Sequence, residues 1–248
     1  MKFILSPAKI FKPHPSPLKG SKPHTHSQTQ VILDSLKSCS IPQLQTLYSI
    51  SESLATQLYT HLHHPQHHPA IYSYYGEAFK SIHLKEMTYQ HLDYLQHHLL
   101  IFSALYGLLR PFDMIQPYRL DFLTPLKQLG LDNSFQTIKK EVTQHLIQSN
   151  SKVIVFICSQ EFKDMIDLSE LRQHAKIIDT SFISIMDGKE KIVSVHAKHA
   201  RGAFLRACTL NNIITLSQLL KLETFDDWYL DHINSTPTHR IYKKTFIK

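Results

Sequence analysis

The side chains best suited to chemistry in this chain are arginines that end apolar segments. The apolar run Leu99–Leu109 stops at Arg110, and Pro111 after it disfavours a helical backbone at that arginine. A second arginine, Arg119, closes the tetrapeptide Gln116-Pro117-Tyr118-Arg119. Buried neighbours and prolines hold such guanidinium groups at the edge of a core, where they can bind phosphate or carboxylate with fixed geometry. These residues predict a site for an anion.

Two further basic segments have the same character. Lys9 follows the apolar residues 1–5 through Ser6-Pro7-Ala8. Lys198 and Arg201 are three residues apart, so they share a face if this segment is a helix, and residues 197–206 contain no acid. Because like charges on one face repel, we expect an anion or a partner to neutralise them. The alternative is a solvated basic helix face.

These segments follow strand candidates, which suggests how the fold brings them together. Four apolar stretches, at residues 3–5, 101–102, 156–158 and 193–195, run directly into polar residues. Ligands of open α/β sheets bind outside the carboxyl ends of the strands. We therefore expect a cationic and aromatic rim that carries Lys9, Tyr106, Arg110, Arg119, Lys198 and Arg201. The full set of candidate DNA- or anion-binding residues adds Gln116, Tyr118, Lys189 and Arg206.

The remaining patterns indicate an α/β fold (mixed α+β), with a mixed central sheet flanked by helices in a single domain over residues 1–248. Apolar spacing typical of helices occurs at 31–36, 41–49, 51–62, 87–98, 134–148 and 198–210, and a short helix is expected at 104–109. Residues 152–158 read as a strand buried on both faces. Asp187-Gly188 predicts a β-hairpin between 176–186 and 191–197, and 240–247 a last strand.

Composition excludes some classes of protein and permits others. The chain has 248 residues, and its 27 basic and 20 acidic side chains give a net charge of +7, which permits an anionic partner without demanding one. No apolar run is long enough to span a bilayer, and the apolar segment at the N-terminus is too brief for a signal peptide. We expect a cytoplasmic protein without membrane association. Three cysteines without CxxC spacing argue against disulfides and a cysteine zinc site.

Other chemistry-bearing groups give weaker signals. Five histidines in residues 61–69 could bind a metal, but no carboxylate or cysteine lies near, so a solvated loop is the better interpretation. Glu77, Asp121 and Glu161 are possible acid/base groups that no spacing pairs. No glycine-rich phosphate loop occurs. We expect no metal and no cofactor, and the sequence names no reaction, which favours a binding protein over an enzyme.

At these residues the chain resembles the YaaA family of peroxide-stress proteins. The resemblance extends from the first residues to about residue 230. It rests on Leu5–Lys9, Ala70-Ile71, Tyr75-Gly76-Glu77, Leu105–Pro111 with Asp113, Ile115–Leu120, Gly188–Lys191, Ala197-Lys198 and Ala200-Arg201-Gly202. The chain departs from the family pattern at Ala104, where the family has glycine, and at His199, where the family has lysine.

The resemblance implies a bacterial protein of the hydrogen peroxide response that is associated with lowering free intracellular iron. It also implies a compact α/β domain with a basic cleft and a helix-hairpin-helix-like element that binds DNA. Glycines in such an element let backbone amides approach phosphate, and Ala104 replaces one of them.

Three hypotheses follow. The favoured one is non-sequence-specific binding of duplex or bubble DNA through the basic rim, with Tyr106 or Tyr118 stacking on an unpaired base. The second is an enzyme that acts on an anionic, nucleotide-like small molecule, with Glu161 or Glu77 as the acid/base group. A deep pocket with convergent carboxylates favours an enzyme, whereas a long open basic groove favours DNA. Direct iron binding is the third, for which the sequence offers no strong ligand set. The oligomeric state is open.

Overall fold

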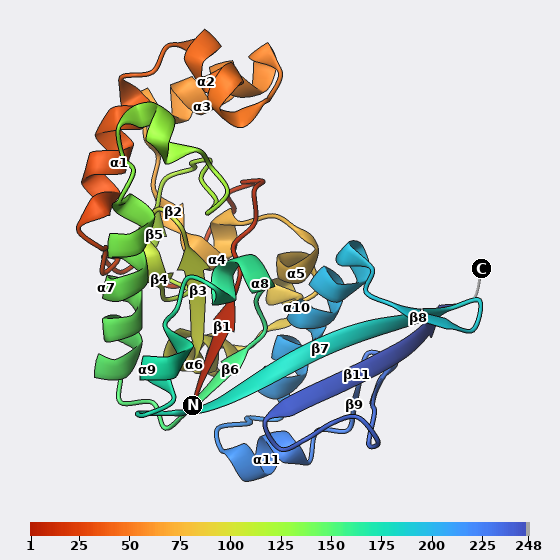
Figure 1. Cartoon of the computed structure of the whole chain (residues 1–248). Helices are drawn as coiled ribbons and strands as arrows, with labels where there is room; N and C mark the ends of the chain where they lie inside the picture. Colours follow the sequence, from red (N-terminus) through yellow and green to blue (C-terminus); the bar gives the residue numbers. More distant parts are fainter. Residues whose placement is uncertain (247–248) are drawn as a thin grey trace.

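Five parallel strands form the centre of a sheet in the computed structural model, which describes residues 1–246. In spatial order they are β3 (Leu99–Ser103), β1 (Lys2–Leu5), β6 (Val153–Phe156), β7 (Lys176–Met186) and β11 (His239–Phe246). Antiparallel strands extend both edges: β4 (Gly107–Leu109) beside β3, then β10 (Trp228–Leu230) and β9 (Thr224–Phe225) beyond β11. The short β8 (Lys189–Lys191) pairs with the end of β7. The predicted α/β fold with a mixed sheet is confirmed (Figure 1).

Helices pack against this sheet and extend one end of it. α10 (Ser194–Leu210) packs along β7, α6 (Tyr89–His98) packs on β1 and β3, and α7 (Ser134–Gln148) packs on β4. α2 (Ile41–Tyr48) and α3 (Glu52–His63) form a separate lobe above α1 (Gln28–Lys37) (Figure 1). The shorter helices are α4 (Ala70–Ser73), α5 (Glu77–Lys80), α8 (Gln160–Lys163), α9 (Leu168–Leu171) and α11 (Leu216–Leu220), with 3-10 turns at Leu84–Glu86 and Leu126–Leu129 and a two-stranded pair of β2 (His68–Pro69) and β5 (Met114–Ile115).

The core strands have the predicted burial pattern. Ile154, Val155 and Phe156 of β6 are at most 2% exposed, so this unalternating strand is covered on both faces. Its neighbour β1 is buried in the same way from Phe3 to Leu5. Because β1, β3 and β6 are mutually parallel, their carboxyl ends meet at one rim of the sheet.

The predicted helix at residues 104–109 is wrong, because the chain turns back there. The Ser103 hydroxyl oxygen accepts hydrogen bonds from the backbone N–H groups of Leu105 and Tyr106, which closes a tight turn. Gly107 then adopts a left-handed backbone (φ 78°), and β4 pairs antiparallel with β3. Most of the segment that suggested a helix-hairpin-helix turn is therefore a β-hairpin.

The predicted strand at residues 191–197 is also wrong beyond Lys191. The β-hairpin itself is confirmed, since both Asp187 and Gly188 have the positive φ angles (52° and 72°) of a type I′ turn. However, α10 already begins at Ser194, so the fourth strand candidate is the first turn of a helix. The apolar stripe of this helix includes Ala197 and Ala200, which are buried at helical spacing.

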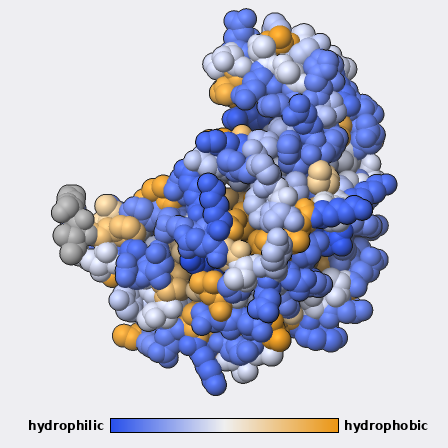
Figure 2. Space-filling model, turned by 180° about the vertical axis from the view of Figure 1, so that it is seen from behind, coloured by the Kyte–Doolittle hydropathy of each residue, from blue (hydrophilic) through white to orange (hydrophobic). Residues whose placement is uncertain are grey.

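Other predicted elements agree closely with the structure. The helix at 134–148 has the predicted bounds, and the last strand covers 239–246, with residue 247 outside the described residues. Figure 2 shows a hollow between the α2–α3 lobe and the arm formed by β7, β8 and β11. Hydrophilic side chains predominate around it. We call this hollow the concave face.

Candidate anion-binding site

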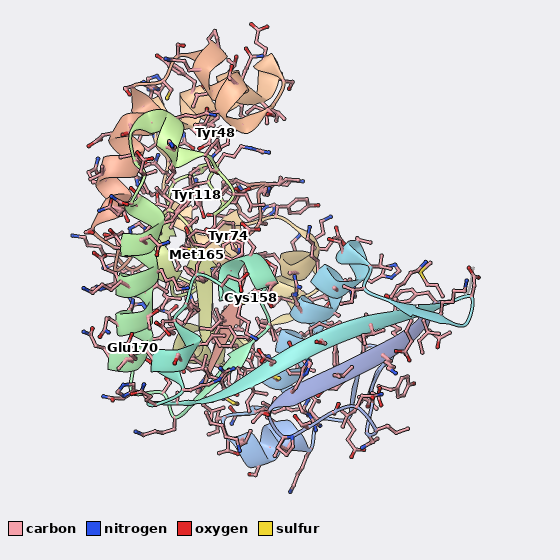
Figure 3. All side chains as sticks on the ribbon, viewed as in Figure 1. Tyr48, Tyr74, Tyr118, Cys158, Met165 and Glu170 are labelled. Carbon is pink, nitrogen blue, oxygen red and sulfur yellow. The ribbon has the colours of Figure 1, made fainter. Side chains whose placement is uncertain are left out.

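A pocket of about 400 Å³ lies where the ends of β1 and β6 meet α5 and α10. Five segments line it: residues 5–10 after β1, 75–80 around α5, 118–121, the start of α8, and two residues of α10. Figure 3 places Tyr118, one of the lining residues, at the inner corner between the α2–α3 lobe and the arm. The pocket thus lies at the base of the concave face.

A hydrogen bond joins the two strand ends that frame the pocket. The backbone N–H of Ser159, after β6, donates to the hydroxyl oxygen of Ser6, after β1, over 2.9 Å. The two hydroxyl oxygens are 3.3 Å apart. The convergence of strand ends predicted from the sequence is therefore present for β1 and β6, and it fixes the polar floor of the site.

Arg201 is the most unusual cation of the pocket. Its side chain is half-buried, yet within residues 1–246 it has no ion pair and no hydrogen bond. Burial lowers the pKa of its guanidinium, and the nearby Cys158 thiol only partly opposes this. A desolvated cation without a counterion is costly, so its position calls for an anionic ligand.

Two further cations share this pocket without carboxylate partners in the described part of the chain. Lys198 lies one helical turn before Arg201 and is exposed at the mouth. Arg119 lies over the ring of Tyr48 at 5.9 Å from its centroid, a cation–π contact that joins the 118–121 segment to α2. Three unpaired positive groups therefore surround one pocket.

Close packing of α10 against α5 places these cations. A Cβ atom at Gly202 would lie 1.9 Å from the carbonyl oxygen of Ala78, so only glycine permits this approach. The Ser81 hydroxyl also donates to the carbonyl of His199 over 2.8 Å. The helix face that carries Lys198 and Arg201 is thereby fixed beside Glu77 and Lys80.

Two carboxyl groups occupy another part of the pocket. Lys9 pairs with Asp121 at 2.6 Å, and Asp121 also accepts hydrogen bonds from Thr124 and Leu123. Burial alone would raise the pKa of Asp121, but the hydrogen bond and charge of Lys9 and the other donors lower it. Burial raises the pKa of Glu161, and the charge of Asp121 adds to this, against a hydrogen bond from the Phe122 N–H.

The structure places the ten candidate residues in three groups. Lys9, Tyr118, Arg119, Lys198 and Arg201 line the pocket. Tyr106 and Gln116 are buried beside it, at 5% and 4% exposure, where the Gln116 N–H donates to the Tyr106 hydroxyl. The remaining three lie outside the pocket: Arg110 pairs with Asp113 at 2.9 Å, Arg206 pairs with Glu86 at 2.5 Å, and Lys189 belongs to β8.

The prediction that Tyr106 or Tyr118 stacks on a base is wrong. Both are 5% exposed, and their rings pack edge to face, 5.6 Å between centroids. The Tyr118 hydroxyl hydrogen-bonds with Tyr74 (2.8 Å) and Ser103 (2.7 Å), and Figure 3 shows Tyr118 and Tyr74 close together. Burial raises the pKa of Tyr106 to about 12. Tyr118 therefore belongs to the packed wall of the pocket, and Tyr106 is buried behind it.

Sequence reasoning missed the aromatic residue that the pocket does expose. Tyr75 lines the pocket, with the ammonium groups of Lys12 and Lys80 at 5.2 and 4.8 Å from its ring centroid. Lys80 also pairs with Glu77 at 2.7 Å. The motif Tyr75-Gly76-Glu77 marked this segment, but nothing in the sequence linked Lys12 to Tyr75.

The described residues contain no group of three or more His, Cys, Asp or Glu side chains arranged to hold a metal ion. Residues 63–67 of the histidine-rich segment are exposed, as the solvated-loop interpretation predicts, but residues 61–63 belong to α3 and His68–Pro69 to β2. Cys39, Cys158 and Cys208 are free thiols. Among residues 1–246, no helix combines the length and the apolarity that crossing a bilayer requires.

Fold and pocket together define an α/β protein with a mixed sheet and a cation-rich site at the strand ends. Comparison with known proteins specifies it further. Residues 1–233 match the family model described as peroxide stress protein YaaA. A UPF0246 protein of Rickettsia peacockii is 33% identical over 224 residues, which cover 89% of this chain and 88% of the relative.

Proteins of two other bacteria are also similar to this chain. A UPF0246 protein of Delftia acidovorans is 30% identical over 263 residues, covering 98% of each chain. One of Fusobacterium nucleatum is 30% identical over 234 residues, covering 90% of this chain and 91% of the relative. The chain belongs to the YaaA family of peroxide stress proteins. The resemblance stated from the sequence motifs is confirmed over nearly the whole chain.

Proposed function

We propose that this protein binds DNA without sequence specificity, through phosphate contacts in the pocket at the base of the concave face. The observation that carries the proposal is the half-buried guanidinium of Arg201, which has no counterion among residues 1–246 and whose pKa is lowered by burial. A phosphate group would neutralise it and accept several of its N–H donors. Lys198 and Arg119 supply further positive charge beside it.

The surroundings of the pocket suit a strand better than an isolated ion. The pocket opens at the concave face, between the α2–α3 lobe and the arm (Figure 2). Tyr75, flanked by Lys12 and Lys80, offers an aromatic ring between two cations. Such a combination supports backbone contacts and stacking on an unpaired base.

The helical hairpin of α2 and α3 is the element that we assign to the helix-hairpin-helix-like role. Its turn at residues 49–51 contains no glycine, and Ser49 adopts a left-handed backbone there (φ 49°). Tyr48 at the end of α2 contacts Arg119, which links this lobe to the pocket.

The family membership supports a role in the response to hydrogen peroxide. We infer that the protein acts in the cytoplasm, where chromosomal DNA is accessible, and that its activity is associated with less free intracellular iron. Electron paramagnetic resonance of chelatable iron, in cells with and without the gene, tests the second inference. Equal iron levels after peroxide exposure would refute it.

Fluorescence anisotropy with labelled DNA tests the binding proposal. We expect comparable affinity for duplexes of unrelated sequence and for a duplex with an unpaired bubble. Lys198→Ala should weaken binding about tenfold, because it removes a charge at the pocket mouth. Lys152→Ala, which removes an exposed lysine at the opposite end of β6, is the matched control and should change affinity less than twofold. Equal effects of the two variants would contradict the proposal.

A second function is favoured by one specific observation, the presence of Asp121 and Glu161 in the lining of one pocket. Their pKa values shift in opposite directions, because burial raises that of Glu161 while the hydrogen bond and charge of Lys9 outweigh burial at Asp121. Enzymes use carboxyl pairs of this kind as acid and base. An enzyme acting on a nucleotide-like anion is therefore the alternative, and turnover that disappears in Glu161→Gln would establish it.

A further inference from the structure

Two neighbouring carboxyl groups in the pocket have unequal environments. The carboxylate of Asp121 accepts from three donors: the Lys9 ammonium on one oxygen, and the Thr124 hydroxyl and the Leu123 N–H on the other. Glu161 receives a single one, the Phe122 backbone N–H on Oε1 at 3.1 Å. Asp121 is therefore held as a carboxylate, whereas Glu161 retains its proton more readily. Such a pair provides one general acid and one anion.

The positive groups of α10 are separate from this pair. Within residues 1–246 neither Asp121 nor Glu161 forms an ion pair with Arg201 or Lys198, although all four line the same pocket. The third carboxylate of the lining, Glu77, pairs with Lys80 at 2.7 Å. A phosphate would bind at the α10 cations and away from Asp121 and Glu161, which repel it. The carboxyl pair then faces an uncharged part of the same ligand.

The apolar part of the pocket lining suits a flat, partly apolar group. Phe79, Tyr118, Leu120 and Phe162 line the pocket together with the charged residues. A volume of about 400 Å³ lies in the range typical of small-molecule sites. A sugar with a base and one phosphate has this combination of charge, size and shape.

We propose that the pocket hydrolyses the N-glycosidic bond of a 5′-phosphorylated nucleoside unit, with Glu161 as general acid, the phosphate on Arg201 and Lys198, and the sugar beside Asp121. The unit is either a free nucleotide or an unpaired residue of a DNA strand. This inference rests on the anion site of the proposed function, and it adds a reaction to that site.

The reaction balances without a redox partner. The bond between C1′ and the base nitrogen breaks, and its electron pair leaves with the base. Glu161 transfers its proton to that base, directly or through water. The carboxylate of Asp121 stabilises the positive charge that develops on the sugar ring and accepts a proton from the attacking water. The water oxygen bonds to C1′, so the products are a free base and a sugar phosphate with a 1′-hydroxyl group. Lys9 keeps Asp121 ionised.

Release of free base, measured by liquid chromatography, tests the reaction. The substrates are the four deoxynucleoside 5′-monophosphates, the same nucleosides without phosphate, and a single-stranded oligonucleotide of mixed sequence. We expect release from phosphorylated substrates to fall at least 100-fold in Glu161→Gln, the range typical of a lost general acid. Nucleosides without phosphate should react at least tenfold more slowly.

A matched control is Glu141→Gln. Glu141 also accepts a backbone N–H from a distant segment, that of Ser27 at 2.7 Å, but it lies outside the pocket. This variant should release base at the wild-type rate. Asp121→Asn is a second test, and circular dichroism verifies folding of each protein. The rate of base release by the wild type should also decline as pH rises and Glu161 loses its proton. The pH profile of the residual rate of Glu161→Gln should lack this decline.

The outcomes separate this inference from the proposed function. Release from monophosphates alone identifies free nucleotides as the source, and release from the oligonucleotide alone identifies the strand. If all substrates remain intact while anisotropy shows DNA binding by the same preparation, the hydrolysis is refuted and the binding proposal stands. Equal release by wild type and Glu161→Gln also refutes it. Absence of both binding and release refutes both.

Discussion

Arg201 is the clearest case of a single charged side chain that destabilises the fold. It lies in a pocket wall without a counterion among residues 1–246, and burial lowers its pKa. Burying a charge without a partner destabilises a fold, so such a residue is retained for what it binds. Asp113, in contrast, neutralises Arg110 within the molecule.

Arg201→Met separates the effect of Arg201 on stability from its role in binding an anion. Methionine keeps most of the volume and removes the charge, so the free energy of unfolding should stay equal or increase by about 1 kcal/mol. DNA affinity should fall about tenfold. Differential scanning calorimetry and anisotropy on the same preparation measure both quantities. Lower stability together with full affinity would mean that Arg201 is merely structural.

Glu161 gives a prediction for pH. Its pKa in the folded protein is raised above the value of the unfolded chain, mainly by burial. The unfolded state therefore loses this proton first, and stability declines as pH rises from the unfolded pKa through the folded one. Asp121 has the opposite effect on the pH dependence of stability. Its pKa is lowered in the folded protein, so it stabilises the fold above the unfolded pKa, and this contribution is lost on acidification.

The variant Glu161→Gln should remove the first of these two effects. Its melting temperature should equal that of the wild type near pH 4 and exceed it near pH 7, because glutamine carries no charge to desolvate. Thermal melts between pH 4 and pH 8 provide the comparison. A wild type that is more stable than the variant at pH 7 would show that Glu161 is ionised and well paired there.

At the scale of the elements, α10 is the part that positions the candidate site. Its contact with α5 depends on Gly202, where a methyl group would collide with the Ala78 carbonyl. Glycine normally weakens a helix by about 1 kcal/mol relative to alanine, so its presence inside α10 has a packing reason. The approach places Lys198 and Arg201 beside the segment of Tyr75.

Gly202→Ala tests this packing, because close contact and helix propensity predict opposite signs for the change in the free energy of unfolding. Helix propensity alone would stabilise the protein by about 1 kcal/mol, whereas the collision should destabilise it by about 1–3 kcal/mol. Urea denaturation gives the change in unfolding free energy. DNA affinity should also fall, because α10 would shift away from α5. A stabilised variant would show that α10 and α5 are not in such close contact.

The elements also show what could be predicted from the sequence. The strands that end at Leu5 and Phe156 were readable because their apolar residues are continuous and polar residues follow at once. In two segments the sequence pattern predicted the wrong element. Residues 193–195 are β-branched enough to suggest a strand, but they form the start of α10, where Val195 is exposed and the buried residues begin only at Ala197. Residues 104–109 look helical, but Ser103 and Gly107 close a turn through contacts that a local pattern does not reveal.

The candidate site was predictable only where one strand end or one helix turn determined it. Lys198 and Arg201 share a helix face by spacing alone, and Lys9 follows β1 directly. The partner of Arg110 is Asp113, only three residues away, whereas the ion pair of Arg206 with Glu86 and the contact of Lys12 with Tyr75 depend on how distant segments pack. Long-range packing therefore decided which of the ten candidates meet in one pocket.

The whole molecule combines a concave face and a net charge of +7 with membership in a peroxide-stress family. If the pocket serves that response, its charges should matter in the cell. A deletion strain that expresses Arg201→Gln should survive hydrogen peroxide no better than the deletion itself. Expression of Glu141→Gln should restore survival to the wild-type level. Full rescue by Arg201→Gln would dissociate the pocket from the response.

The central claim is that phosphate groups bind at the cations of the pocket, and the salt dependence of DNA affinity tests it most directly. Each phosphate neutralised on duplex DNA contributes about −0.9 to the slope of the logarithm of the association constant against the logarithm of salt concentration. We predict a steep negative slope for the wild type, alike for unrelated sequences, and a slope about one unit shallower for Lys198→Ala, with Lys152→Ala unchanged. An affinity that does not vary with salt, or equal slopes for all three proteins, would contradict the claim.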